Sequence, residues 1–179
     1  MAAYKLLVAY DGTDFAGWQR QLNRRTVQAL IEDALAPIEG RPVRAVAAGR
    51  TDAGVHAAGQ VVSVALDAGL APERLARALN AVLPEDVRIM ACEAAPPGFD
   101  ARKHAVAKTY RYTIFNGPVM PPALRRTAWH VPQPLALGPM QEAAAAIVGT
   151  HDFRPFQARG SAVKTTVRTV TKSVLGRVG

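Results

Sequence analysis

The chain has 179 residues and a mass of 19.1 kDa, which is enough for one ordinary domain or two small ones. Apolar residues make up 49% and charged residues 20% of the chain, a globular composition that excludes a disordered polypeptide. No apolar run reaches the roughly 18 residues that a membrane helix needs, so we expect no membrane association. The single cysteine, Cys92, cannot form an internal disulfide, and we expect a cytoplasmic location without a signal peptide.

The formal net charge of +8 is distributed unevenly along the chain. Residues 1–90 contain ten Lys or Arg and ten Asp or Glu, whereas residues 91–179 contain twelve and four. A basic surface on one half suits a polyanion, because cations that contact phosphates release condensed counterions. The charge therefore favours nucleic acid as a partner, with a solvated basic face as the alternative.

The pattern of the first half predicts the element order β-α-β-β-α-β. We expect strands at residues 4–10, 43–47, 60–66 and 87–92, and helices at residues 27–38 and 72–83. In the first helix, apolar residues recur at the spacing of one helical face, with Thr26 as its N-cap and Gly40 at its end. This order is that of the ferredoxin-like fold, in which two helices cover one face of a four-stranded sheet.

The second half predicts a further unit of the same kind that stops early. Residues 105–116 alternate as a long strand does, residues 137–148 have an apolar helical face, and residues 163–175 are rich in Thr and Val. We therefore expect an α+β chain with an N-terminal ferredoxin-like domain at residues 1–100 and a basic, incomplete ferredoxin-like domain at residues 101–179.

A Gly-rich stretch, AAGRTDAGVHAAGQV at residues 47–61, connects two of the predicted strands. Glycines on either side of Arg50 and Asp52 let the backbone turn tightly and let a flat ligand approach it. A neighbouring guanidinium favours the ionised form of a carboxylate, and an ionised, positioned carboxylate is a competent nucleophile. The alternative is that Asp52 is only a turn or cap residue.

Other polar residues are weaker candidates for chemistry. Asp11 and Asp14 could pair with Asp52 for acid and base work, as carboxylates do in glycosidases, although a turn would use such residues anyway. His56 suits a structural hydrogen bond as well as catalysis. The four histidines have no metal-ligand spacing, so we expect no zinc site.

The stretch KTYRY at residues 108–112 is a second candidate site. On a strand, Lys108, Tyr110 and Tyr112 would share one face, and Arg111 would lie on the other. Aromatic rings between cations are suited to stacking on bases and contacting phosphates. The alternative is a pair of half-buried strand tyrosines.

Several stretches, taken together, resemble the tRNA pseudouridine synthase A family. They occur in family order and span most of the chain: YDGTDFAGWQRQ (10–21), TVQ (26–28), AGRTDAGVHAAGQV (48–61), LN and LP (79–80, 83–84), FDAR (99–102), KTYRY (108–112) and HDF (151–153). The AGRTDAGVHA stretch is the most specific of them.

The resemblance implies an isomerase that converts uridine to pseudouridine at positions 38 to 40 of the tRNA anticodon stem-loop, without a cofactor or metal. It implies that Asp52 is the nucleophile, attacking either C1′ or C6, and that Arg50 pairs with Asp52. It also implies that Tyr110 packs on the target base and is a candidate for the later proton transfer. From charge alone we add further tRNA contacts at Arg102, Lys103, Lys108, Arg111, Arg125 and Arg126.

The family resemblance also implies an architecture: two ferredoxin-like halves with joined antiparallel sheets and a central active-site cleft, in a homodimer. Family members continue past this point with a motif of the form F-[LV]-x-x-M-V-R, which supplies another arginine. That motif is absent from the 179 residues. We therefore expect a C-terminally truncated second half, and the activity of this chain is a separate question from its family.

Other functions stay open from the residues alone. The chain could be a catalytically incomplete fragment or a non-catalytic RNA-binding module on a ferredoxin-like sheet. Such a module gains nothing from the anion of Asp52 on a phosphate-binding face. A metal-independent hydrolase would depend strongly on Asp11 or Asp14, whereas the isomerase would use Asp14 only for structure.

Overall fold

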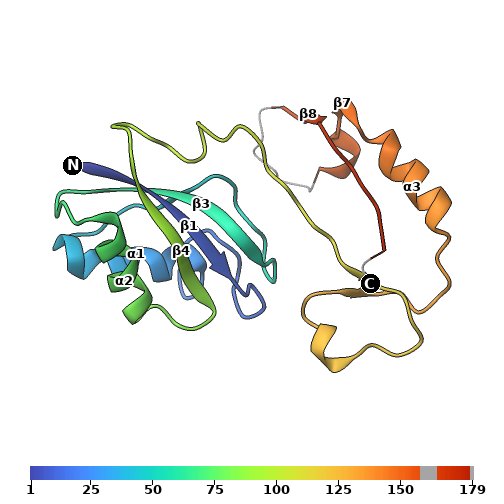
Figure 1. Ribbon diagram of the computed structural model, residues 1–179, viewed down its shortest axis with the longest axis horizontal. Coiled ribbons are helices and arrows are strands. Elements are labelled where there is room, and N and C mark those ends of the chain that lie inside the picture. The colour runs from blue at the N-terminus through green and yellow to red at the C-terminus, as the bar shows by residue number, and fades with distance from the viewer. Residues whose placement is uncertain (158–164, 178–179) are drawn as a thin grey trace. The chain divides into compact units, whose positions relative to one another are not determined.

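The structure, a computed structural model, describes residues 1–157 and 165–177. It divides into two compact units, Met1–Arg111 and Tyr112–Gly179 (Figure 1). Within the described residues, no helix is both long and apolar enough to cross a membrane.

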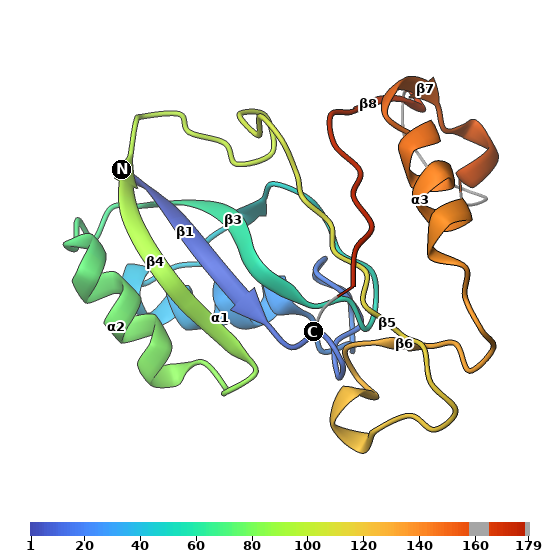
Figure 2. The same ribbon diagram turned by 45° about the vertical axis from the view of Figure 1, so that its right-hand side comes forward.

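The first unit is a four-stranded antiparallel sheet with two helices on one face (Figure 2). Its elements are β1 (Ala2–Tyr10), α1 (Val27–Glu39), β2 (Val46–Ala47), β3 (Ala57–Leu66), α2 (Pro72–Val82) and β4 (Val87–Ala95). The strands lie in the order β2-β3-β1-β4 and every neighbouring pair is antiparallel. The element order predicted for the first half is therefore present.

The core of this unit lies between the sheet and the helices. Along the central strand β1, alternate residues are buried, from Tyr4 at one end to Tyr10 at the other, because successive side chains point to opposite faces. On α1 the predicted stripe of Val27, Ile31 and Leu35 is fully buried. The periodicity thus identified the helix face correctly.

The ends of α1 agree only in part with the sequence. Gly40 ends the helix in the left-handed conformation, at φ +75°, and its N–H donates to the Ala36 carbonyl. Thr26 occupies the N-cap, but its side chain makes no capping hydrogen bond. Its hydroxyl is buried and has no hydrogen-bond partner in the described chain, so Thr26 is the N-cap residue, as predicted, but without a side-chain capping bond.

The strand expected at residues 43–47 is shorter than predicted. Only Val46 and Ala47 pair with β3, opposite Ser63 and Val62. Val43 and Ala45 are buried in the core without belonging to a strand. Apolar alternation here reflects burial, whereas a strand also requires a partner backbone along its length.

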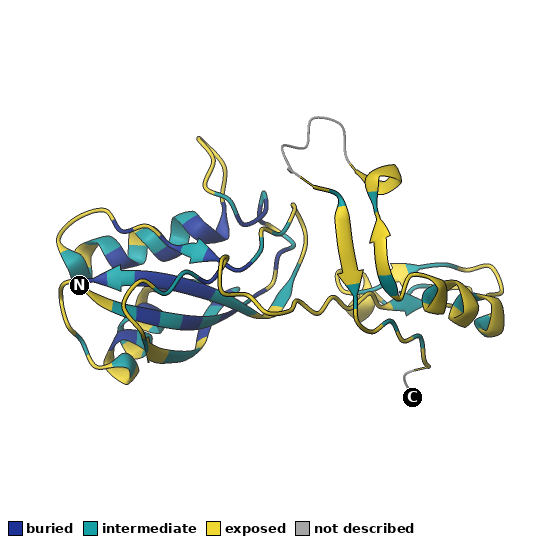
Figure 3. Ribbon diagram, turned by 90° about the horizontal axis from the view of Figure 1, so that it is seen from above, coloured by how far each residue is buried: buried dark blue, intermediate teal, exposed yellow. Residues whose placement is uncertain are grey.

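The described part of the second unit contains short elements. They are β5 (Ile114–Phe115), a 3₁₀ turn (Pro122–Leu124), β6 (Trp129–His130), α3 (Leu137–Ala146), β7 (Gly149–Asp152), a second 3₁₀ turn (Arg154–Phe156) and β8 (Val167–Val170). The parallel pair β5-β6 and the antiparallel pair β7-β8 each form a two-stranded sheet. None of residues 112–157 and 165–177 is buried, in contrast to the first unit (Figure 3).

Several predictions for this half are corrected. The long strand expected at residues 105–116 is reduced to Ile114–Phe115, because residues 105–113 form no ladder with another strand in the described chain, and only the Thr113 carbonyl among them accepts from the strand β6, at the Trp129 N–H. The predicted helix is present as α3, and the strand expected at 163–175 is present as Val167–Val170, with residues 163–164 outside the described range. The described strands of the chain form one sheet of four strands and two sheets of two strands.

Candidate active site

The predicted nucleophile lies on a loop, residues 48–56, that connects β2 to β3 and is called the RTD loop below. A second loop, residues 11–25, connects β1 to α1 and is called the supporting loop. Hydrogen bonds join the two loops. The Trp18 N–H donates to the Thr51 carbonyl (3.0 Å), the Gly54 N–H to the Phe15 carbonyl (3.3 Å), and the Gly12 N–H to Nδ1 of His56 (3.3 Å). The supporting loop therefore fixes the path of the RTD loop.

Two glycines allow this close approach. A Cβ atom at Gly12 would lie 2.0 Å from the Val55 carbonyl oxygen, and one at Gly17 would lie 2.7 Å from the Thr51 carbonyl oxygen. Gly17 also has φ +93°, where a side chain is strained. Trp18 and Phe15 are buried beside these glycines and anchor the supporting loop in the core.

The end of β1 lies directly beneath the RTD loop. The buried hydroxyl of Tyr10 is 2.8 Å from Oγ1 of Thr51, the residue before Asp52. Gln60, at the start of β3, donates from Nε2 to the Gly49 carbonyl at 2.5 Å. Burial raises the pKa of Tyr10, and its hydrogen bond to Thr51 and the nearby Gln60 side chain lower it by less, so that the pKa is raised overall. Tyr10 is therefore a neutral hydrogen-bonding group at neutral pH.

Asp11 has a structural role. Its Oδ1 accepts hydrogen bonds from the N–H and the hydroxyl of Thr13, at 3.0 and 2.5 Å, an Asx-type turn. The same oxygen lies 3.1 Å from Nδ1 of His56. Asp11 and His56 thus join the two loops, which supports the structural alternative for both residues.

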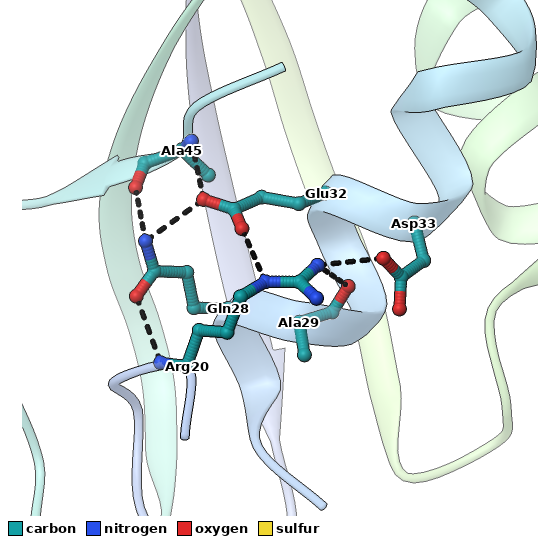
Figure 4. Close-up of polar contacts among 6 residues, drawn as sticks. All are labelled: Arg20, Gln28, Ala29, Glu32, Asp33 and Ala45. Atoms are coloured by element: carbon teal, nitrogen blue, oxygen red, sulfur yellow. Dashed lines mark hydrogen bonds and ion pairs between the residues drawn. The ribbon is translucent and has the colours of Figure 1, made fainter. Parts of the chain in front are cut away.

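A network of polar contacts holds α1 to the segments around it (Figure 4). The Gln28 amide accepts from the Arg20 N–H (3.0 Å) and donates to the Ala45 carbonyl (3.1 Å) and the Glu32 carboxylate (2.8 Å). Glu32 in turn accepts from the Ala45 N–H (3.0 Å) and from Nε of Arg20 (2.7 Å). Ala45 lies immediately before β2, so the network helps to fix the strand that leads into the RTD loop.

Arg20 also binds Asp33, at 2.6 Å. The carboxylates of Asp33 and Glu32 raise the pKa of Arg20 above its ordinary value. Arg25, at the other end of the supporting loop, makes two hydrogen bonds to Asp86, at 2.7 and 2.9 Å, and its guanidinium carbon lies 4.1 Å from the Phe15 ring centre. Through these contacts, Arg20 and Arg25 stabilise the conformation of the supporting loop.

Asp52 differs from its neighbours because its carboxylate is exposed and has no hydrogen-bond or ion-pair partner within residues 1–157 and 165–177. Its backbone carbonyl accepts from the Val55 N–H at 3.2 Å, closing a turn. Arg50 is exposed as well, and the ion pair expected between Arg50 and Asp52 is not formed. The two side chains are therefore both exposed on the RTD loop and form no ion pair with each other.

The other predicted site residues are all exposed. The Lys108 side chain lies over Gly49, where an added Cβ atom would be 3.1 Å from its Nζ, so the structure brings Lys108 to the RTD loop. Tyr110 is 68% exposed, and no contact in the described chain joins it to Arg50 or Asp52. Because residues 105–113 form no strand, the face predicted to be shared by Lys108, Tyr110 and Tyr112 does not exist.

Arg102 and Arg111 have no described side-chain contact to the RTD loop. The Arg102 N–H donates to Oδ1 of Asp100 at 2.9 Å, as does that of Lys103, so the turn is held by Asp100. The Ala101 N–H donates to the Ser63 hydroxyl (3.0 Å), which fixes this turn against β3. No cluster of three or more potential metal ligands occurs among the residues that the structure describes.

Residues 6–102, which include both loops and the sheet beneath them, match the family described as tRNA pseudouridine synthase. The chain belongs to this family. The matched range covers more than half of the chain and contains Asp52, Arg50 and their supporting residues, so the family assignment and the candidate site rest on the same unit.

Curated relatives match the chain over nearly its whole length. Three proteins named tRNA pseudouridine synthase A are 47% identical in Methylacidiphilum infernorum, 46% in Methylobacterium sp. strain 4-46 and 42% in Acetivibrio thermocellus. The alignments cover 95%, 100% and 99% of this chain and 67%, 72% and 72% of those proteins, respectively. The chain therefore spans about 70% of the length of these family members.

Sequence reasoning missed the residues that hold the RTD loop in this family member. The sequence pattern indicates a turn at Gly12 and a strand at Gln60, and it assigns no role in the site to Tyr10 or Gly17. The signal available was a cluster of turn residues directly after a strand that ends in Tyr10. Which loop those residues contact depends on the pairing of β1 with β3, and local patterns do not encode that pairing.

Proposed function

We propose that this chain acts as an isomerase that converts uridine to pseudouridine at positions 38 to 40 of the tRNA anticodon stem-loop, with Asp52 as the nucleophile. In this reaction the C1′–N1 bond of the uridine breaks, the uracil rotates, and a C1′–C5 bond forms. The proton on C5 leaves and N1 gains one, so substrate and product have the same atoms. Membership of the tRNA pseudouridine synthase family supports the reaction class.

The observation that carries the assignment of Asp52 is a contrast among aspartates. Asp11, Asp100 and Asp152 each accept a hydrogen bond from a backbone N–H two residues further on, as turn aspartates do. Asp52 accepts none in the described chain, although it sits in a tight turn. A turn role therefore does not account for its carboxylate, which is left accessible for covalent chemistry on a fixed loop.

The remaining roles follow from what the target requires. A uridine in a stem must be taken out of the base stack, which costs a few kcal/mol. Arg50, exposed two residues from Asp52, is suited to hold the extruded nucleotide, and Tyr110, with its ring 68% exposed, is suited to stack on the base. Lys108 beside Gly49 supplies a phosphate contact close to Asp52, with Arg102 and Arg111 further along the same exposed segment.

The proposal includes the architecture and partners of the whole enzyme. Two ferredoxin-like halves, divided near residue 100, would join their sheets and enclose a cleft, and two copies of the enzyme would bind the tRNA. The net charge of +8, with its excess in residues 91–179, supports a basic tRNA-binding surface. We place the reaction in the cytoplasm, without a cofactor or metal.

A position-specific assay tests this function. The 179-residue chain is incubated with unmodified tRNA transcripts that carry uridine at only one of positions 38, 39 or 40, and pseudouridine is mapped by mass spectrometry. A transcript with cytidine at all three positions is the control. Pseudouridine at these positions, and not in the control, supports the proposal. Bound tRNA without product would instead identify an RNA-binding module or a catalytically incomplete chain.

The Tyr110→Phe variant tests the role of the tyrosine. Phenylalanine keeps the ring for stacking and removes the hydroxyl, so tRNA affinity should stay within about twofold while turnover falls by about tenfold or more. The affinity is measured by filter binding and the turnover by pseudouridine formation. Unchanged turnover would exclude the hydroxyl as a proton carrier.

A further inference from the structure

We propose that Tyr10 is a positioning residue for Asp52, acting through a buried hydrogen bond to Thr51. The inference rests on the proposed function, in which Asp52 is the nucleophile. Tyr10, Thr51 and Gln60 are together called the polar frame. Within the frame, Tyr10 and Gln60 contact the RTD loop on the two sides of Arg50, at the Thr51 hydroxyl and the Gly49 carbonyl.

The first contact of the polar frame is the one nearest the nucleophile. Tyr10 ends β1 and is only 5% exposed, and its hydroxyl meets Oγ1 of Thr51 at 2.8 Å. Thr51 is covalently joined to Asp52, and its carbonyl accepts from the Trp18 N–H at 3.0 Å. A buried hydroxyl that loses its partner gains little from water, so this contact is costly to break.

The second contact of the frame lies one residue before Arg50. Nε2 of Gln60 donates to the Gly49 carbonyl at 2.5 Å, and the Gln60 side chain partly offsets the burial that raises the pKa of Tyr10. The pairing of β1 with β3 shifts register between Val8 and Tyr10, so the end of β1 departs from the regular ladder at this point. The frame connects the RTD loop to both strands where the ladder is irregular.

Asp52 depends on this frame because its own side chain has no partner within residues 1–157 and 165–177. Its position is therefore set by its backbone. Attack on a carbon atom requires the carboxylate oxygen to be held about 3–3.5 Å from that atom in the correct orientation. Small displacements of the Thr51–Asp52 peptide should then slow the chemical step while leaving the phosphate contacts that bind tRNA in place.

The chain offers a matched control at the other end of the same strand. Tyr4 is on β1, on the same sheet face as Tyr10, and is 2% exposed. Its hydroxyl also makes one hydrogen bond, donating to the Leu70 carbonyl at 2.7 Å. Tyr4→Phe and Tyr10→Phe thus remove the same group from similar environments, and only Tyr10 contacts the RTD loop.

Hydrogen exchange tests the frame independently of catalysis. The amides of Trp18 and Gly54 donate across the two loops, so their exchange reports how firmly the RTD loop is held. We expect Tyr10→Phe and Thr51→Val each to accelerate this exchange by about tenfold or more, and Tyr4→Phe to leave it within about twofold of the wild type. Equal exchange in Tyr10→Phe and Tyr4→Phe would overturn the proposal.

Kinetics test whether the frame serves the reaction. Tyr10→Phe and Thr51→Val should each lower kcat by about tenfold with KM within about twofold, and the double variant should be no slower than either, because both remove one contact. Tyr4→Phe should keep the wild-type kcat. Additive losses in the double variant, or equal losses in Tyr4→Phe, would indicate a general structural effect and overturn the proposal.

The Asp52→Asn variant separates this inference from the function on which it rests. If Asp52→Asn keeps its turnover, or the wild-type chain has none, the proposed function is wrong and the positioning role is lost with it. If Asp52→Asn is inactive while Tyr10→Phe matches the wild type in exchange and kcat, the function stands and only the positioning role is wrong.

Discussion

The buried apolar side chains of the first unit extend from Tyr4 to Ala101, whereas none of the described residues of the second unit, 112–157 and 165–177, is buried. Both units contain strands and a helix of similar type. In the first, α1 and α2 each bury an apolar stripe against the sheet. In the second, α3 has no buried residue, and Trp129, next to β5, is 69% exposed.

The comparison shows where the candidate site gets its rigidity. Burial of apolar area is the main source of folding free energy, so we assign the stability to the first unit. The RTD loop is held by hydrogen bonds to that core through Trp18, Phe15 and Tyr10. Lys108 and Tyr110, by contrast, lie on an exposed segment at the end of the unit. The backbone of Asp52 is therefore fixed by the fold, whereas Lys108 and Tyr110, the residues proposed to contact the substrate, are not held in this way.

The largest difference between the units should appear when an isoleucine in each unit is replaced by alanine. Ile31 in α1 is fully buried and Ile147, which follows α3, is 43% exposed. Ile31→Ala should lower the free energy of unfolding by about 2–5 kcal/mol, because it leaves a cavity in the core. Ile147→Ala should change it by about 0.5 kcal/mol or less. Urea denaturation measures both, and similar losses would contradict the comparison.

Loop contacts in the first unit should give the next largest effect. Gly17→Ala places a Cβ atom 2.7 Å from the Thr51 carbonyl oxygen at φ +93°, so it combines a clash with backbone strain. Gly40→Ala is the control, because Gly40 has φ +75° but nothing within 4 Å of an added Cβ. We expect about 1 kcal/mol of destabilisation for Gly40→Ala and about 2–3 kcal/mol for Gly17→Ala.

Thermal unfolding of the two glycine variants, together with turnover, checks this prediction. Only Gly17→Ala should also reduce turnover, since only Gly17 contacts the RTD loop. If the two variants were equally stable and equally active, the contact between the supporting loop and the RTD loop would contribute to neither stability nor turnover.

A smaller effect is expected from pH, through Glu39 at the C-terminal end of α1. Glu39 accepts hydrogen bonds from the N–H groups of Asp67 (2.8 and 2.9 Å) and Ala68 (3.1 Å), and these lower its pKa below the ordinary 4.5. A lowered carboxylate pKa in the folded state contributes stability above pH 4.5 that is lost as the pH falls from 4.5 towards the folded value.

The melting temperature of the wild type should therefore fall more steeply below pH 4.5 than that of Glu39→Gln, which cannot titrate at this position. Melting curves recorded at several pH values between about 3 and 7 test this. Parallel plots of melting temperature against pH for the two proteins would show that Glu39 does not contribute to the pH dependence of stability.

The sequence predicted the elements that depend on local patterns. The stripe of Val27, Ile31 and Leu35 identified α1 because a helix closes its hydrogen bonds within one segment. Strand predictions were less accurate because a strand needs a partner elsewhere in the chain. Val43 to Ala45 and residues 105–113 alternate like strands but have no ladder in the described chain.

The candidate site, like the fold, was predictable only in the part that depends on local sequence. The exposed position of Asp52 on a tight loop follows from its glycines, and Lys108 lies beside that loop. The contacts of Tyr10, Gly17 and Gln60 were not predictable, because they join segments about 10 to 40 residues apart through the register of the sheet. The expected ion pair of Arg50 with Asp52 is not formed, because both side chains are exposed to water, where such a pair gains little.

The central claim is that a rigid loop presents Asp52 for chemistry and not for structure or binding. Single-turnover pseudouridine formation and tRNA affinity of Asp52→Asn, compared with the turn-residue control Asp100→Asn, test it most directly. We expect Asp52→Asn to lower the rate by about a thousandfold or more with affinity within about threefold of the wild type, and Asp100→Asn to retain its rate. Similar rates for the two variants would contradict the account. So would a loss of rate in Asp52→Asn that is no larger than its loss of tRNA affinity.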